Sequence, residues 1–199
     1  MLELSGKLEP VQISEPDKID LFVVSKSKDL PAPLRKKYVY FGPSDSKLSG
    51  FGAYILKDQK FIPKDGNVYS YNDWCYYFCD SDVIRIDSRK NRVRSLYRNN
   101  SNSTSILLTE RCNHYCLMCS QPPREIDDSV LMDEAFNLIR LLPRDIQDLG
   151  LTVGEPTLYG ERLINLVHHI KAYLPQTPLD ILTNGRAFAE EHYTQLMAE

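Results

Sequence analysis

Short apolar runs alternate with longer amphipathic segments along the second half of the chain. The three apolar runs lie at residues 105–108, 148–153 and 179–183, and their length is typical of buried strands. The amphipathic segments at residues 129–142, 161–173 and 187–197 repeat apolar residues at helical spacing, which predicts three helices. Because strands and helices alternate, we expect parallel strands joined by right-handed crossovers, as in an α/β fold.

The first two predicted helices carry apolar faces and end signals. The face of the first consists of Val130, Leu131, Ala135, Leu138, Ile139 and Leu142. The face of the second consists of Leu163, Leu166, Val167 and Ile170. Pro143 and Pro175 follow the two helices and are typical stop signals. Asp127 and Asp128 precede Ser129 and are interpreted as helix-capping residues rather than an acid/base pair.

Residues 1–100 have a different character, rich in Tyr and β-branched side chains. Short runs at residues 38–41, 53–56 and 82–86 are bounded by Gly, Pro, Asp and Ser, and they predict short antiparallel strands. A hairpin is expected where residues 83–86 and 92–97 flank the polar turn 87–91. The polar stretch 99–104 resembles a linker. We therefore expect a β-rich N-terminal domain at 1–100 and an α/β domain at 101–199.

Composition restricts the classes of function. The 199 residues are 42% hydrophobic and 26% charged, which is typical of a globular chain. The net charge of -3 and scattered Lys and Arg make a nucleic-acid partner unlikely. The chain has no leader-like N-terminus and no run near the roughly 18 apolar residues of a membrane span, so we expect no membrane partner and a cytoplasmic location.

Three cysteines form the strongest motif, within residues 109–120, which we call the cysteine loop. Cys112, Cys116 and Cys119 are spaced C-x3-C-x2-C. Three thiolates can hold three irons of a [4Fe-4S] cluster and leave the fourth iron open, whereas clusters that only carry electrons usually take four cysteines. The alternative is zinc with a fourth ligand from His114, Cys75 or Cys79, although His114 is too close along the loop to complete a tetrahedral site easily.

Two further polar segments follow the other predicted strands. Gly154 and Glu155 come after the second strand, and Thr183 and Asn184 end the third. The cysteine loop follows the first. The carboxyl ends of parallel strands share one edge of a sheet, where α/β folds build their sites. The sequence therefore predicts that all three segments lie together.

These segments, in this order, resemble the radical S-adenosylmethionine (SAM) superfamily over residues 105–199. More narrowly, Leu108–Pro123, Leu151–Gly160 and Ile181–Arg186 look like the His-Xaa-Ser system radical SAM maturase, a likeness that extends to the hairpin at 82–98. The resemblance implies the first three β/α units of a partial (β/α)6 barrel behind the β-rich domain. A truncated gene product is the expected reason for the short core; a fragment and a half-barrel that pairs with another chain are the alternatives.

The resemblance also implies cofactors and site residues. Cys112, Cys116 and Cys119 would ligate a [4Fe-4S] cluster, and SAM would chelate the open iron and release a 5′-deoxyadenosyl radical. The other implied SAM contacts are Met118 at the adenine, Gly154 and Glu155 at the amino group, and Thr183 and Asn184 at the ribose or carboxylate. Val153 replaces the first of two glycines usual in the family, which would weaken SAM binding if the backbone must approach closely.

The implied partners are a ribosomally made peptide substrate, a second radical SAM maturase and an external electron donor. The alternatives are a truncated, non-catalytic peptide-binding or assembly subunit that keeps the cluster, and a radical SAM enzyme acting on RNA or a small molecule.

Other reactive side chains have simpler interpretations. Cys75 and Cys79 are interpreted as buried apolar residues rather than ligands of an auxiliary cluster, and His168 and His169 as solvated or partly packed side chains. The basic run 89–94 is interpreted as a solvated hairpin face, with docking of a partner as the alternative.

Overall fold

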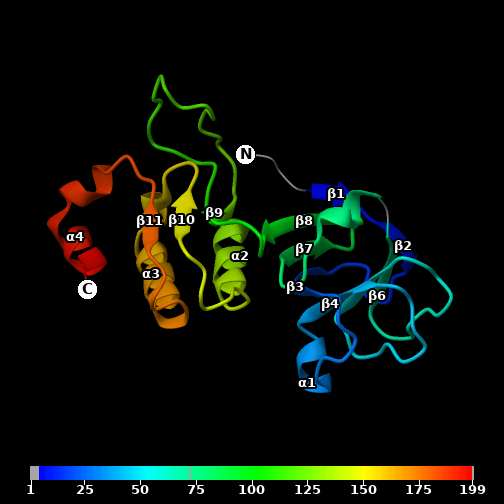
Figure 1. The fold of residues 1–199 in the computed structure, drawn as a ribbon. Coiled ribbons are helices and arrows are strands. Elements are labelled where there is room, and N and C mark those ends of the chain that lie inside the picture. The colour runs from blue at the N-terminus through cyan, green and yellow to red at the C-terminus, as the bar shows by residue number, and fades with distance from the viewer. Residues whose placement is uncertain (1–4, 72, 199) are drawn as a thin grey trace. The chain divides into compact units, whose positions relative to one another are not determined.

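The computed structural model describes residues 5–71 and 73–198. The chain divides into two compact units, Met1–Ser101 and Asn102–Glu199, which are described separately (Figure 1). Together they form a mixed α/β protein with one large and one small sheet.

The first unit is built on an eight-stranded sheet with the order β1-β8-β7-β3-β4-β5-β6-β2. The strands are β1 (Ser5–Lys7), β2 (Glu9–Gln12), β3 (Ile19–Ser25), β4 (Tyr38–Gly42), β5 (Ala53–Leu56), β6 (Asn67–Ser70), β7 (Val83–Asp87) and β8 (Arg92–Tyr97). One short α-helix, α1 (Ala32–Arg35), and one 3₁₀ helix, η1 (Asp73–Tyr77), lie in the connections.

Leu8 closes this sheet on itself. The two edge strands β1 and β2 are consecutive in the chain and only Leu8 separates them, so the two ends of the sheet must meet. β1 pairs with β8 and β2 with β6, both antiparallel, while the Leu8 amide donates to Asn91 O at 2.7 Å. Leu8 is 0% exposed and belongs to the apolar core of the unit. That core consists of Leu8, Phe22, Val24, Val39, Phe41, Ala53, Ile55, Tyr69, Cys75, Phe78, Ile84, Ile86 and Val93.

The expectation of antiparallel strands is wrong for the middle of this sheet. β3, β4, β5 and β6 are parallel neighbours. Parallel neighbours need connections that return the chain to the starting end of the sheet. Residues 26–37, 43–52 and 57–66 supply these connections, and Leu48 and Phe51 from the second of them pack into an apolar cluster with Tyr54. The hairpin prediction is confirmed, because β7 and β8 pair antiparallel around residues 88–91.

The second unit has the predicted alternation of strands and helices. Its sheet contains β9 (Ser105–Leu107), β10 (Leu149–Thr152) and β11 (Leu179–Ile181), all parallel, in the order β11-β10-β9. Its helices are α2 (Ser129–Ile139), η2 (Pro156–Tyr159), α3 (Glu161–Tyr173), η3 (Arg186–Ala189) and α4 (Glu191–Ala198). The single helix expected over 187–197 is wrong, because extended backbone at Glu190 separates η3 from α4. The completion of a partial barrel stays a prediction.

The apolar faces are confirmed for α3 and partly for α2. Leu163, Leu166, Val167 and Ile170 are all buried, together with Ile164. On α2 the buried side includes Met132, which was not predicted, whereas Val130 is 65% exposed. Val130 lies two residues from Met132, about 200° around the helix, so the two cannot share a face.

Within residues 5–71 and 73–198, no helix combines the length and apolar character that crossing a bilayer requires.

We expect Leu8→Ala to lower the free energy of unfolding of the first unit by about 3 kcal/mol, because it removes a fully buried side chain and leaves a cavity. Urea unfolding followed by fluorescence of the single Trp, which belongs to this unit, measures the loss. Leu34→Ala is the matched control, since Leu34 is exposed on α1 and its truncation should change stability by less than about 0.5 kcal/mol. Equal effects of the two variants would contradict the closure of the sheet through Leu8.

Candidate functional site

The three segments that follow β9, β10 and β11 meet at one edge of the small sheet, which we call the carboxyl edge. Residues 108–128 connect β9 to α2 and extend beyond the end of the sheet (Figure 1). Gly154 and Glu155 follow β10, and Thr183 and Asn184 follow β11. The Asn184 side chain donates to Asn113 Oδ1 at 2.8 Å, so the cysteine loop contacts the segment after β11. The structure therefore brings the predicted polar segments together.

Glu155 links the ends of β10 and β11. Its side chain is fully buried, and Oε1 accepts from the amide and hydroxyl of Thr157 at 3.0 and 2.6 Å and from the Thr183 hydroxyl at 2.7 Å. Oε2 accepts from the Asn184 amide at 2.7 Å. Burial acts to raise the pKa of Glu155, but the hydrogen bonds, led by the Thr157 hydroxyl, lower the pKa below its ordinary value of 4.5. The carboxylate is thus ionised and already occupied by protein donors.

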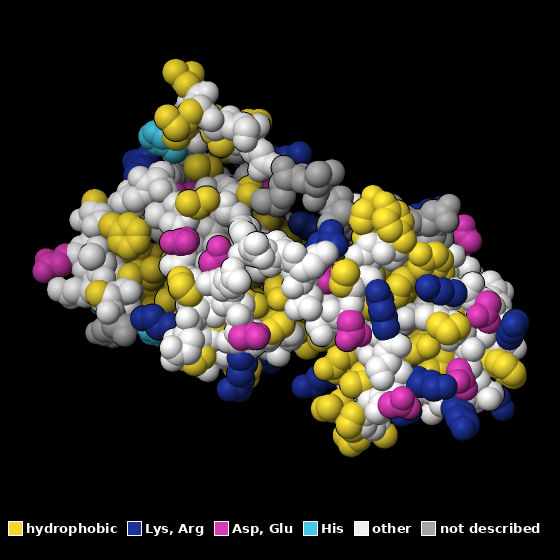
Figure 2. Space-filling model, viewed as in Figure 1, with side chains coloured by type: hydrophobic (Ala, Val, Ile, Leu, Met, Phe, Trp, Pro, Cys, Tyr) yellow, Lys and Arg dark blue, Asp and Glu magenta, His cyan; other side chains and the backbone are white. Residues whose placement is uncertain are grey.

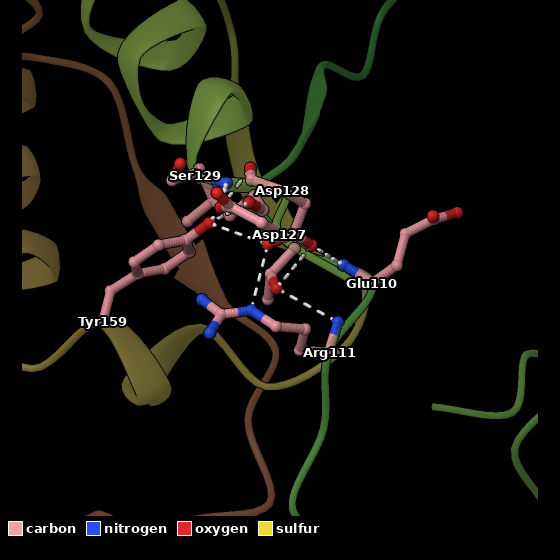
Figure 3. A network of polar contacts seen from close by, with 8 residues as sticks. Glu110, Arg111, Asp127, Asp128, Ser129 and Tyr159 are labelled. Atoms are coloured by element: carbon pink, nitrogen blue, oxygen red, sulfur yellow. Dashed lines mark hydrogen bonds and ion pairs between the residues drawn. The ribbon is translucent and has the colours of Figure 1, made fainter. Parts of the chain in front are cut away.

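Asp128 forms a second buried carboxylate centre, between the start of the cysteine loop and α2 (Figure 3). Its Oδ2 accepts from the Thr109 hydroxyl at 2.8 Å and the Glu110 amide at 2.6 Å. Oδ1 accepts from Arg111 Nε at 3.0 Å and from the Tyr159 hydroxyl at 3.2 Å. Burial acts to raise the pKa of Asp128, but these hydrogen bonds, led by the Glu110 amide, hold the pKa below its ordinary value of 3.8.

The capping interpretation is correct for Asp127 and wrong for Asp128. Asp127 Oδ1 accepts from the Ser129 amide at 3.1 Å, as a capping residue does. Asp128 occupies the N-cap position, but its side chain makes no capping hydrogen bond because it points to Thr109, Glu110 and Arg111 instead. Sequence reasoning missed this network. Its partners lie 17 to 31 residues from Asp128, so no local periodicity marks them.

The three cysteines lie on the exposed part of the connection. Cys112 is half-buried, whereas Cys116 and Cys119 are exposed, and none is in a disulfide. The Cys119 amide donates to Cys116 O at 3.0 Å, which closes a turn between them. Among the described residues, no three His, Cys, Asp or Glu side chains lie close enough together to hold a metal ion. The donor set fits an iron–sulfur cluster in kind, as three free thiols within one loop, but the thiols must converge to bind it.

Apolar side chains are also exposed at the tip of this connection, as Figure 2 shows for the same view. Tyr115, Leu117 and Met118 are all strongly exposed, and Met118 reaches 94%. The position implied for adenine contact is therefore accessible to solvent.

The structure also places the other cysteines and the histidines considered above. Cys75 is buried in the core of the first unit, as interpreted, while Cys79 is half-buried. His114 and His168 are exposed. His169 packs against the rings of Phe136 and Tyr173, and its Nε2 lies 3.2 Å from Phe136 O.

The backbone at Val153 and Gly154 has positive φ angles, +72° and +61°. A Cβ atom on Gly154 would lie 2.3 Å from Arg111 O and 2.6 Å from Thr109 O, so only glycine fits between the strand end and the cysteine loop. A β-branched residue with positive φ is a genuine outlier. Val153 is therefore strained at the position where the resemblance places a glycine.

Comparison with known proteins gives a superfamily match for the second unit. Residues 106–199 match the family model described as Radical SAM superfamily, so this part of the chain contains a radical SAM superfamily domain. A curated protein of Helicobacter pylori (strain ATCC 700392 / 26695), named UPF0026 protein, is 30% identical over 99 residues, which cover 45% of this chain and 32% of that protein. The chain thus spans about a third of the length of this relative. No solved structure matches the chain.

Val153→Gly should stabilise the second unit by about 1 kcal/mol. Strain at a positive φ costs about 1–3 kcal/mol, and the greater backbone freedom of glycine in the unfolded chain offsets about 0.5–1 kcal/mol of the relief. The loss of helical circular dichroism on heating measures the change. Thr152→Gly, one residue earlier inside β10, is the control and should destabilise instead. A lower melting temperature for Val153→Gly would contradict the strain at this position.

Glu155→Gln should destabilise the second unit by about 2 kcal/mol at neutral pH, because the amide nitrogen that replaces one carboxylate oxygen would face either the Thr157 and Thr183 donors or the Asn184 amide. The pKa of Glu155 is lowered by folding, so its ionised form stabilises the unit above the ordinary pKa of 4.5, and this contribution is lost as pH falls through the lower folded pKa.

The difference in melting temperature between Glu155→Gln and the unchanged chain should therefore be largest above about pH 5 and shrink in acid. Asp133→Asn is the control, since Asp133 pairs with Arg162 at the exposed surface and should have little effect at any pH. A difference independent of pH would contradict the ionised state assigned to Glu155.

Proposed function

We propose that residues 106–199 bind a [4Fe-4S] cluster and SAM and take part in radical SAM chemistry. The observation that carries the proposal is the meeting of the cysteine loop, Gly154–Glu155 and Thr183–Asn184 at one carboxyl edge, joined by the hydrogen bonds of Glu155 and Asn184. The superfamily match over the same residues supports it.

Under this proposal Cys112, Cys116 and Cys119 are the cluster ligands. When bound, the cluster and SAM would supply the radical chemistry: one-electron cleavage of a SAM carbon–sulfur bond would leave methionine and give a 5′-deoxyadenosyl radical able to abstract hydrogen from a substrate. The protein contributes binding, orientation and exclusion of water. Because Cys116 and Cys119 are exposed and lie in one turn, they can move toward Cys112 without breaking the small sheet.

SAM would lie over the exposed backbone that follows β10 and β11. Gly154 presents its backbone without a side chain, so carbonyl oxygens of this segment can face an ammonium group. The carboxylate of Glu155 is committed to Thr157, Thr183 and Asn184, so its part is to orient these segments. Met118 is exposed and polarizable, and it can pack on an adenine ring when the loop closes.

We further propose a peptide substrate, as in His-Xaa-Ser system maturation, with a second radical SAM maturase and an external electron donor as partners in the cytoplasm. The residues that support this narrower proposal are Leu108–Pro123, Leu151–Gly160 and Ile181–Arg186, which resemble that maturase.

A second candidate function is a non-catalytic subunit that keeps the cluster and binds a peptide without using SAM. Val153 favours it, because a strained β-branched side chain stands where the family has a glycine. The two functions differ in one product. 5′-Deoxyadenosine formed from SAM by the reduced, cluster-loaded chain would exclude the non-catalytic subunit.

Anaerobic reconstitution tests cluster binding directly. We expect about four irons and about four sulfides per chain, and near-complete loss of both in Cys112→Ala, Cys116→Ala and Cys119→Ala. Cys79→Ala is the matched control, since this half-buried thiol lies in the first unit, and it should keep the full cluster. A chain that binds one zinc ion and no sulfide would overturn the proposal.

A further inference from the structure

The two ends of the cysteine loop are held very differently. On the N-terminal side, the Glu155 amide donates to Arg111 O at 2.8 Å, and Asn184 Nδ2 donates to Asn113 Oδ1 at 2.8 Å. Arg111 and Asn113 flank Cys112, so hydrogen bonds hold the chain on both sides of it, through the backbone at Arg111 and through an exposed side chain at Asn113. In the described chain, by contrast, residues 114–123 form hydrogen bonds only among themselves, from Cys119 to Cys116 and to Gln121.

Asp128 is the common hydrogen-bond acceptor for the N-terminal part of the cysteine loop. Its carboxylate accepts from three consecutive residues, Thr109, Glu110 and Arg111, the last of which directly precedes Cys112. Arg111 is held from its other face as well, because its guanidinium lies 5.1 Å from the centre of the Tyr159 ring. Asp128 is only 3% exposed, so these hydrogen bonds are shielded from water.

Hydrogen bonds between Arg124 and Glu110 join the outgoing and returning parts of the connection next to Asp128. The Arg124 amide donates to Glu110 O at 3.1 Å, and the Arg124 guanidinium reaches Glu110 Oε2 at 3.1 Å. Asp128 therefore holds the base of the loop that carries the exposed thiols of Cys116 and Cys119, although it follows them in the sequence.

We propose that Asp128 is a positioning residue for the first cluster ligand: through Thr109, Glu110 and Arg111 it fixes Cys112 in the cluster-free chain, and Cys116 and Cys119 then close onto this preset thiol. The inference rests on the proposed function and adds an order of assembly to it. It assigns no direct contact between Asp128 and the cluster.

The test measures the alkylation rate of each cysteine in the cluster-free full chain, by mass spectrometry. In the unchanged chain Cys112 should react more slowly than Cys116 and Cys119. Asp128→Asn should raise the Cys112 rate about ten-fold, the lower range expected when a buried charge-assisted hydrogen bond no longer holds the closed form, and leave the other two within about two-fold. Asp127→Asn removes the neighbouring charge but keeps a side-chain oxygen that can accept from Ser129, so it is the control and should leave all three rates unchanged.

Reconstitution of the same variants gives a second readout. Asp128→Asn should assemble the cluster several-fold more slowly in visible absorbance, whereas Asp127→Asn should match the unchanged chain. If Asp128→Asn does not fold by circular dichroism, Arg111→Lys and Tyr159→Phe replace it. Arg111→Lys keeps the charge but loses the Nε contact, and Tyr159→Phe keeps the ring but loses one donor.

A folded Asp128→Asn variant with an unchanged Cys112 rate would overturn the proposal, as would an equal rise at all three cysteines, which indicates general loosening. Failure of the unchanged chain to bind iron and sulfide is a separate result. It would overturn the proposed function, while the alkylation rates would still decide whether Asp128 fixes Cys112.

Discussion

Two buried carboxylates determine how the carboxyl edge of the second unit is arranged. An ionised carboxylate inside a protein is costly unless hydrogen bonds compensate it, and Asp128 and Glu155 each have four. Asp128 joins the start of the cysteine loop to α2 and Tyr159, whereas Glu155 joins the ends of β10 and β11. Because the donors to these two carboxylates come from all three strand ends, none of the three segments can shift without removing hydrogen bonds from a buried charge. The chain's own groups therefore hold this edge together.

The sequence predicted the parts of the second unit that depend on local periodicity. The buried face of α3 follows from apolar spacing, and the parallel direction of the three strands follows from their alternation with helices. Spacing could not reveal that β4 and β5 are parallel, because an apolar run has the same form whichever way its neighbour runs. It equally could not assign Asp128, because a residue before a helix is a capping candidate until its distant partners are known. Long-range pairing, not local preference, decided both cases.

Close packing at Val153 and Gly154 forces the backbone into a positive-φ conformation. Gly154 lies against the carbonyl oxygens of Thr109 and Arg111, so the chain must pass there with a positive φ. The residue before it shares that backbone path, and Val153 adopts it at the cost of strain. Such strain persists only where surrounding contacts determine the backbone, and the hydrogen bonds of Glu155, two residues after Val153, provide such contacts. The strained residue therefore lies in the predicted cofactor segment because that segment packs closely against the carbonyl oxygens of Thr109 and Arg111.

The tip of the cysteine loop, unlike the carboxyl edge, is exposed and weakly held. Its thiols and the apolar side chains of Tyr115, Leu117 and Met118 are exposed, and residues 114–123 lack hydrogen bonds to the rest of the described chain. Covering exposed apolar side chains lowers the free energy of the protein in water. Metal binding commonly orders the segment that supplies the metal's ligands. Under the proposed function, a cluster held at Cys112 would provide both effects. On that proposal, the hydrogen-bonded edge would fix where the cofactor binds, and the exposed tip could close over it.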